Sequence, residues 1–247
     1  MSAAVVTGRM ADASPRLTAR MAGVCELLEG LTSVIGQQVI LGRLVVNGDA
    51  AATATNILAH ESLFRLGFAS SLVAVAFHVA WTLLFYDLFK PVNRSLSLLA
   101  SFVMLVGCAM QALTGLLYLA PLVVLRGGSP ASAFTATQVQ ALALLFLRLN
   151  GQAYNTCLVF FGLWCVLIGY LIFRSTFLPR ILGVLLALDG VGWATFLWPP
   201  LASQLFPVIA AVAGLAELPL ALWLLVVGVN AQRWGERASA AGASLRP

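Results

Sequence analysis

The sequence predicts an all-α membrane protein, a six-transmembrane-helix bundle with its N- and C-termini in the cytoplasm. Of the 247 residues, 61% are hydrophobic and only 9% are charged, and the mean hydropathy is +0.96. A soluble domain carries about 25% charged residues, so this composition indicates a chain whose solvent is the bilayer. Six apolar runs are each long enough for the roughly 20 helical residues that cross the hydrocarbon.

The first run, Arg20–Leu41, is the most polar of the six. Glu26, Glu29, Ser33 and Gln37 share one helical face, because positions i, i+3 or i+4, and i+7 lie on the same side. A carboxylate in the bilayer is costly unless it faces protein or water, so we expect this stripe to face other helices. In an alternative arrangement this run lies at the membrane surface and only five spans cross.

Five further apolar runs are predicted to span the membrane. They are Arg65–Phe89, Ser95–Leu122, Leu149–Phe173, Arg180–Leu201 and Leu205–Asn230. Asp87 and Lys90, at the end of the second run, are expected to pair at the surface. A weak similarity at a spacing of about 84 residues is compatible with a parallel repeat that relates helices 2–3 to helices 4–5.

The orientation follows from the basic residues, because short cytoplasmic loops carry an excess of Lys and Arg. With the N-terminus inside, ten of the 14 basic residues lie on the inner side. The inner residues are Arg9, Arg16, Arg20, Lys90, Arg94, Arg174, Arg180, Arg233, Arg237 and Arg246, and the outer residues are Arg43, Arg65, Arg126 and Arg148. We therefore expect a disordered cytoplasmic tail over 1–19, a transmembrane domain over 20–232 and a cytoplasmic tail over 233–247.

The first outer loop contains the signals of a short amphipathic helix. Asp49 is a good N-cap for a helix that runs to Phe64. Glu61 and Arg65 are four residues apart, so they are expected to pair on its surface.

Four segments of the chain resemble a known bacterial membrane family. They are Gly48–Thr53 running on to Glu61–Arg65, Pro91–Leu96, Phe177–Gly183 and Glu217–Leu224. The family is domain of unknown function 4386, and the resemblance extends from about Arg20 to Trp234. It implies a compact multi-pass protein of the bacterial inner membrane, and it implies no particular reaction, substrate or cofactor.

The candidate ligand- or proton-binding residues are the ionisable and amide groups inside the spans, since such residues mark ion and substrate paths. At about 1.5 Å of rise per residue, they fall in the inner half or near the middle of their helices. They are Glu26, Glu29, His78, Gln111, Asp189 and Glu217. Asn150 lies at the outer end of the fourth span.

Glu217 is the sharpest single candidate. Its helical face otherwise carries the small residues Ala210, Ala213, Gly214, Ala221 and Gly228, and small residues let membrane helices approach closely. Pro219 also frees a backbone carbonyl one turn earlier. An acid on a close-packed face suits an ion or substrate site. Alternatively, a protonated Glu217 only bonds a neighbouring helix, and His78 is a hydrogen-bonded packing residue.

Several classes of function are disfavoured by the residue types present. Zinc hydrolases usually need three protein ligands with His prominent, whereas the chain has only His60 and His78. Haem ligation by two His on facing helices fails for the same reason. The four cysteines form no C-x-x-C. We expect no cofactor and no metal, and the scattered basic residues indicate no nucleic acid.

Two functions from different classes remain. In the first, Glu29, His78 and Glu217 converge on a central cavity, and the protein binds or moves a small ligand, an ion or a proton. In the second, the protein is a non-catalytic scaffold or sensor whose polar residues specify helix packing. An intramembrane hydrolase, which would need two carboxylates about 5–10 Å apart, ranks below both. The lipid bilayer is the expected partner, and a homo-oligomer remains open.

Overall fold

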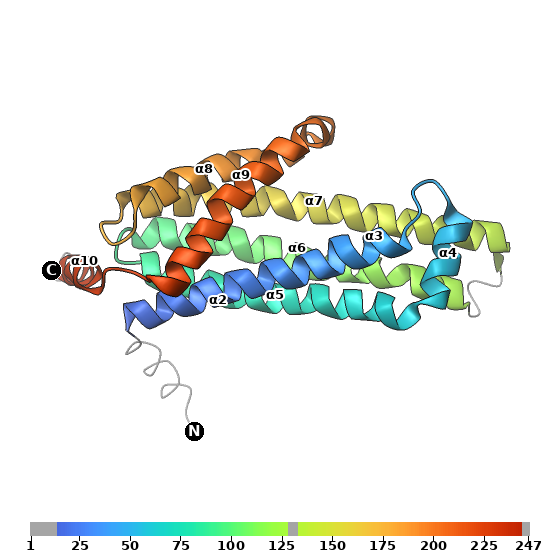
Figure 1. The fold of residues 1–247 in the computed structure, drawn as a ribbon, viewed down its shortest axis with the longest axis horizontal. Helices are drawn as coiled ribbons and strands as arrows, with labels where there is room; N and C mark the ends of the chain where they lie inside the picture. Colours follow the sequence, from blue (N-terminus) through green and yellow to red (C-terminus); the bar gives the residue numbers. More distant parts are fainter. Residues whose placement is uncertain (1–13, 128–132, 244–247) are drawn as a thin grey trace, which may run out of the picture. The chain divides into compact units, whose positions relative to one another are not determined.

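A computed structural model describes residues 14–127 and 133–243, and in these residues the chain forms helices and no strands (Figure 1). This confirms the all-α prediction. The elements are α2 (Pro15–Ser33), the π-helix η1 (Val34–Ile40), α3 (Leu41–Leu44), α4 (Ala50–Ala59), α5 (Glu61–Phe89), α6 (Arg94–Arg126), α7 (Ala136–Arg174), α8 (Arg180–Ala194), the 3-10 helix η3 (Thr195–Leu197), α9 (Pro199–Val226) and α10 (Ala231–Ala243).

Six helical stretches in the described residues are long and apolar enough to cross a membrane, which confirms the predicted number of spans. They are Pro15–Leu44, Glu61–Phe89, Arg94–Arg126, Ala136–Arg174, Arg180–Leu197 and Pro199–Val226. The first is one continuous helical stretch of 30 residues, which favours six spans over five. The cytoplasmic position of both termini and the parallel repeat stay predictions.

The chain divides into two compact units. Unit 1 contains Met1–Leu27, Val79–Leu105 and Val159–Pro247, and unit 2 contains Leu28–His78 and Val106–Leu158. Four helices, α2, α5, α6 and α7, continue from one unit into the other. Each unit has its own set of buried apolar side chains.

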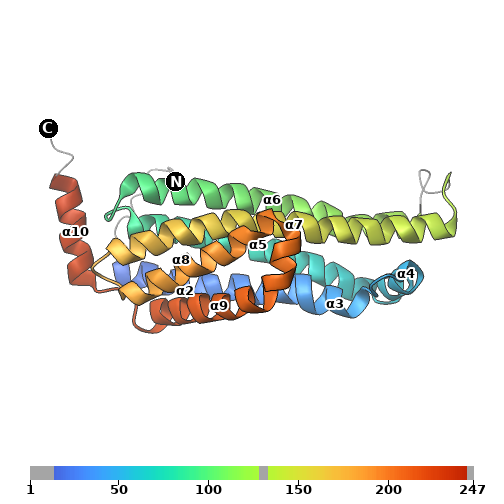
Figure 2. The same cartoon turned by 90° about the horizontal axis from the view of Figure 1, so that it is seen from above.

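In unit 1, the C-terminal part of α7 packs antiparallel to α8 through four glycines, and the two helices lie side by side in Figures 1 and 2. A Cβ added at Gly162 would lie 2.6 Å from the Gly190 carbonyl oxygen, and one at Gly169 would lie 2.6 Å from the Gly183 carbonyl oxygen. Side chains larger than hydrogen do not fit at such distances. The seven-residue spacing on both helices repeats this contact after two turns.

An aromatic cluster fills the space beside this contact in unit 1. The rings of Trp81 and Trp164 have centroids 4.5 Å apart, and Phe85 lies 5.1 Å from Trp164. Such ring pairs add roughly 0.5–1.5 kcal/mol beyond the area that they bury. Unit 2 has a separate apolar core that joins η1, α3, α4, α5, α6 and α7. Its buried members are Ile40, Leu44, Ile57, Phe64, Tyr118, Leu122 and Leu147.

The predicted local contacts are present. The Asp49 carboxylate accepts a hydrogen bond of 2.9 Å from the Ala52 N–H, which confirms it as the N-cap of α4. The helix ends at Ala59 and not at Phe64, because His60 leaves the helical conformation. Arg65 Nε donates to Glu61 at 2.7 Å, as predicted. Lys90 and Asp87 also pair at 2.7 Å, as predicted.

Several helix boundaries differ from the predicted ones. α2 begins at Pro15, so residues 15–19 are helical, and the rest of the predicted N-terminal tail, 1–13, lies outside the described residues. α7 begins at Ala136 and runs without a break into the predicted fourth span. Most of the predicted C-terminal tail forms α10. α9 begins with two prolines, which suit a first helical turn, and it is followed by Gly228 at φ +73°.

Candidate functional site

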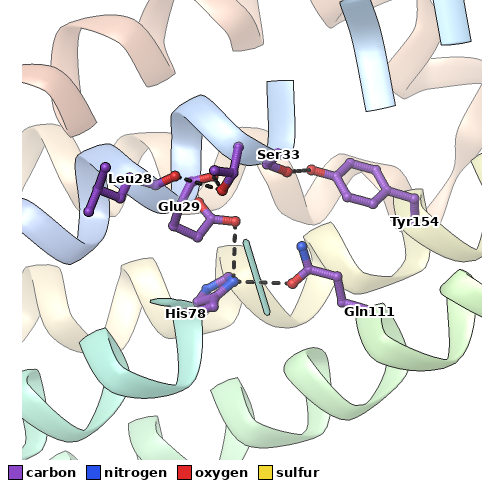
Figure 3. Close-up of polar contacts among 7 residues, drawn as sticks. Leu28, Glu29, Ser33, His78, Gln111 and Tyr154 are labelled. Atoms are coloured by element: carbon purple, nitrogen blue, oxygen red, sulfur yellow. Dashed lines mark hydrogen bonds and ion pairs between the residues drawn. The ribbon is translucent and has the colours of Figure 1, made fainter. Parts of the chain in front are cut away.

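The polar residues of unit 2 meet at Glu29 on α2, His78 on α5 and Gln111 on α6 (Figure 3). His78 Nδ1 lies 3.5 Å from Glu29 Oε1 and 3.2 Å from Gln111 Oε1. His78 and Gln111 are buried, and the Glu29 side chain is 18% exposed. Unit 2 therefore holds an acid and an imidazole in direct contact within the spans.

This contact defines where a proton can lie. Both oxygens that face His78 Nδ1 are acceptors, so the arrangement assigns a hydrogen to that nitrogen. The pair becomes an ion pair only when the imidazole is protonated and the carboxyl of Glu29 is not. Carboxyl and imidazole groups inside the spans are the kinds of group that carry protons through membrane proteins.

Two further layers of polar contacts continue along the same face of the first helical stretch. Ser33 shares a hydrogen bond of 2.9 Å with the Tyr154 hydroxyl. One turn further, Gln37 Nε2 donates to Ser71 Oγ at 3.4 Å and Gln37 Oε1 accepts from Asn150 Nδ2 at 3.5 Å. We call these residues, together with the Glu29 group, the polar track. Its members are Glu29, Ser33, Gln37, Ser71, His78, Gln111, Asn150 and Tyr154.

The π-helix η1 carries Gln37 and lies very close to α5. A Cβ at Gly36 would lie 2.7 Å from the Gly67 carbonyl oxygen and would also clash with Ser71 Oγ. The buried Tyr118 hydroxyl donates to the Gly36 carbonyl at 3.1 Å. A π-helical turn leaves the regular bonding pattern and is found frequently at functional sites. Tyr118 satisfies one backbone oxygen, and the loosened turn presents Gln37 to Asn150.

Asn150 is fully buried, and its Oδ1 accepts no hydrogen bond from the residues that the structure describes. A buried amide oxygen without a donor costs about 1–3 kcal/mol, and such a group is usually explained by a water or a ligand. The polar track therefore offers one acceptor position to a hydrogen-bond donor from outside the chain.

Asn150→Leu is expected to leave the thermal stability of the detergent-solubilised protein unchanged or to raise it, by up to about 1 kcal/mol. Leucine has a similar shape, and the apolar group removes an unpaired oxygen at the cost of one long hydrogen bond. The comparison variant is Gln152→Leu, since Gln152 is exposed on the same helix. A loss larger than about 1 kcal/mol for Asn150→Leu alone would show that the oxygen has a firmly held donor even without added ligand.

The second group of intramembrane acids lies in unit 1. Trp193 Nε1 donates to Glu217 Oε1 at 3.3 Å. Asp189 is fully buried in the same unit. Glu26 also belongs to this unit.

The six predicted site residues thus fall into two groups, each within one unit. Glu29, His78 and Gln111 contact one another in unit 2, and Glu26, Asp189 and Glu217 belong to unit 1. Of the predicted stripe, Glu29, Ser33 and Gln37 contact polar side chains of other helices, as expected. Convergence of Glu29, His78 and Glu217 on one cavity stays a prediction.

The small-residue face around Glu217 is closely packed only in part. Ala213 and Ala221 are buried, but Gly214 is exposed and a Cβ there would meet open space. The close approach of α9 to α2 occurs at Gly23, where a Cβ would lie 2.7 Å from the Ala221 carbonyl oxygen. The glycine of the first helical stretch, and not that of α9, makes this approach possible.

Within the described residues, no three His, Cys, Asp or Glu side chains are grouped as metal ligands. The all-helical fold with six membrane-crossing stretches defines a multi-pass membrane protein. A model of the family domain of unknown function 4386 matches residues 21–228, so the chain belongs to that family. No curated protein and no solved structure is significantly similar to the chain.

Proposed function

We propose that this protein binds a small cation in exchange for a proton at Glu29, His78 and Gln111, and that it acts as a proton-linked carrier or ligand-binding protein. The observation that carries the proposal is the 3.5 Å contact between the Glu29 carboxyl and the His78 imidazole inside the spans. Glu29 releases its proton to water as its carboxylate takes up the positive charge of the ligand, and His78 Nδ1 donates a hydrogen bond to that carboxylate.

The charges in the polar track support a cation over an anion. Glu29 is its one carboxyl group, and its other members are neutral amides and hydroxyls besides His78. In unit 2, the basic residues Arg65 and Arg126 form ion pairs, and both of them pair with Glu61. An anion at Glu29 would meet a like charge in a medium of low dielectric, which is strongly unfavourable.

The test is proton release from the purified full-length protein in weakly buffered detergent solution. Sodium, potassium and methylammonium chlorides are added in turn, and a pH indicator reports the released protons. We expect at least one of these cations to release protons in proportion to the protein. If none of them releases protons above a protein-free control, the exchange proposal is wrong. Transport is then measured with the active cation in proteoliposomes that contain a pH-sensitive dye.

Glu217→Gln provides a second comparison in the same assay. If the two acid groups act on one ligand, Glu217→Gln reduces proton release, as Glu29→Gln does. If unit 2 acts by itself, the variant keeps the release of the wild-type protein, and the Trp193–Glu217 contact serves helix packing.

The scaffold alternative is favoured by one observation: several polar groups of the track bond a different helix of unit 2. Such bonds can specify packing without a ligand.

A further inference from the structure

The C-terminal helix α10 is docked on unit 1 through arginine side chains. Arg233 Nη1 donates to the Thr176 carbonyl at 3.1 Å, and Arg237 Nη2 donates to the Arg174 carbonyl at 3.3 Å. Both acceptors lie at or just beyond the C-terminal end of α7, where unpaired carbonyls favour positive charge. Arg233 and Arg237 therefore hold α10 in place, and they also add positive charge at this end of unit 1.

α10 is amphipathic like an interfacial helix, with one half-buried face and one polar, exposed face. Trp234 Nε1 donates to the Leu88 carbonyl at 2.9 Å, so the indole lies against the end of α5. Trp234, Ala238 and Ala241 share a half-buried face, and the polar side chains of Gln232 and Glu236 are exposed. Figure 2 shows α10 running across the direction of α8 and α9. Helices of this kind lie in the plane of the headgroups, where Trp is favoured.

Basic residues gather around this docked helix. They occupy the ends of α5, α6, α7, α8 and α10, all within unit 1, and we call them the basic end. They are Lys90, Arg94, Arg174, Arg180, Arg233 and Arg237.

The arginines of the basic end differ from those of unit 2 in their partners. Arg65 and Arg126 in unit 2 both pair with Glu61. In the described part of the chain, Lys90 pairs with Asp87, whereas the arginines of the basic end have no carboxylate within ion-pair distance. Arg180 instead lies over the Phe173 ring, 5.6 Å from its centroid. Their positive charge is therefore left for a partner from outside the chain.

We propose that the basic end binds the headgroup of an anionic phospholipid. Guanidinium groups match phosphate oxygens in pairs, and juxtamembrane basic clusters attract anionic lipids. A phospholipid also supplies acyl chains for the apolar surface of the adjoining spans, which free phosphate cannot do. With the predicted orientation of the termini, the lipid belongs to the cytoplasmic leaflet. This site is independent of the exchange proposed at Glu29.

The test compares phosphatidylglycerol and phosphatidylcholine of the same chain length, titrated into the full-length protein in detergent and counted by native mass spectrometry. We expect the wild-type protein to bind phosphatidylglycerol roughly tenfold more tightly or better, because each basic residue near an anionic group contributes about fivefold. Arg174→Gln/Arg180→Gln should reduce this preference to below about threefold. Equal binding of the two lipids by the wild-type protein would overturn the proposal.

Two further variants separate charge from folding. Arg233→Gln/Arg237→Gln should also lose the preference, but it removes the contacts that hold α10, so limited proteolysis of α10 accompanies it. Arg43→Gln/Arg148→Gln removes two arginines of unit 2 and should keep the preference. A preference that survives both changes at the basic end, or one that inorganic phosphate alone abolishes, would also overturn the assignment to a lipid.

Discussion

Replacing Glu29 by Gln is expected to abolish cation-linked proton release from the protein. The amide keeps the size of the side chain and can still accept a hydrogen bond from His78. It cannot release a proton or carry the negative charge that balances a cation. The measurement is the pH-indicator assay with the cation that is most active on the wild-type protein.

Glu61→Gln is the matched control for this substitution. Glu61 is also a glutamate of unit 2, but it lies at the first residue of α5 and pairs with Arg65 and Arg126. The control variant should retain proton release, because its carboxylate is balanced within the chain. Retention of release by Glu29→Gln would remove Glu29 from the site and leave the polar track as a packing device.

The residues that the first helical stretch contributes to the polar track could be predicted from the sequence. The residues that they contact could not. Glu29, Ser33 and Gln37 were predicted to share a face because helical periodicity determines which residues lie on one side. Their partners come from α5, α6 and α7, and only the tertiary fold shows that Ser33 meets Tyr154. The four-residue spacing of Asn150 and Tyr154 was an available signal, since it places both on one face of α7.

It could not be predicted either that the neighbouring acids Glu26 and Glu29 belong to different units. Glu26 and Glu29 are three residues apart and belong to one predicted stripe, yet Glu26 belongs to unit 1 and Glu29 contacts His78 in unit 2. A small rotation around the helix axis selects the helices that each acid meets, and periodicity does not indicate those neighbours.

Two elements were missed for different physical reasons. The π-helical turn η1 depends on close contacts at Gly36 and on the Tyr118 hydroxyl, which are tertiary features. α10 is polar enough to resemble a tail, but Trp234, Ala238 and Ala241 follow a helical spacing that could have indicated it. The span count, the Asp49 cap and the Glu61–Arg65 pair were predicted correctly because they depend on composition or on local sequence.

The contact between α7 and α8 leads to a second prediction of large effect, and it concerns stability. Gly183→Ala should lower the thermal midpoint of the detergent-solubilised protein. The added Cβ would lie 2.5 Å from the Gly169 carbonyl oxygen and 2.8 Å from the Phe173 nitrogen. Both are backbone atoms, so the helices must separate, and overpacking of this kind costs about 1–3 kcal/mol.

Gly214→Ala makes the same substitution where the structure leaves open space. Alanine is the better helix former by roughly 1 kcal/mol, so this variant should be slightly more stable than the wild-type protein. The two changes are therefore expected to have opposite signs. Cys108, Cys157 and Cys165 are buried, and a thiol-reactive dye can report their exposure during heating. A midpoint for Gly183→Ala equal to that of Gly214→Ala would show that α7 and α8 do not require glycine at their contact.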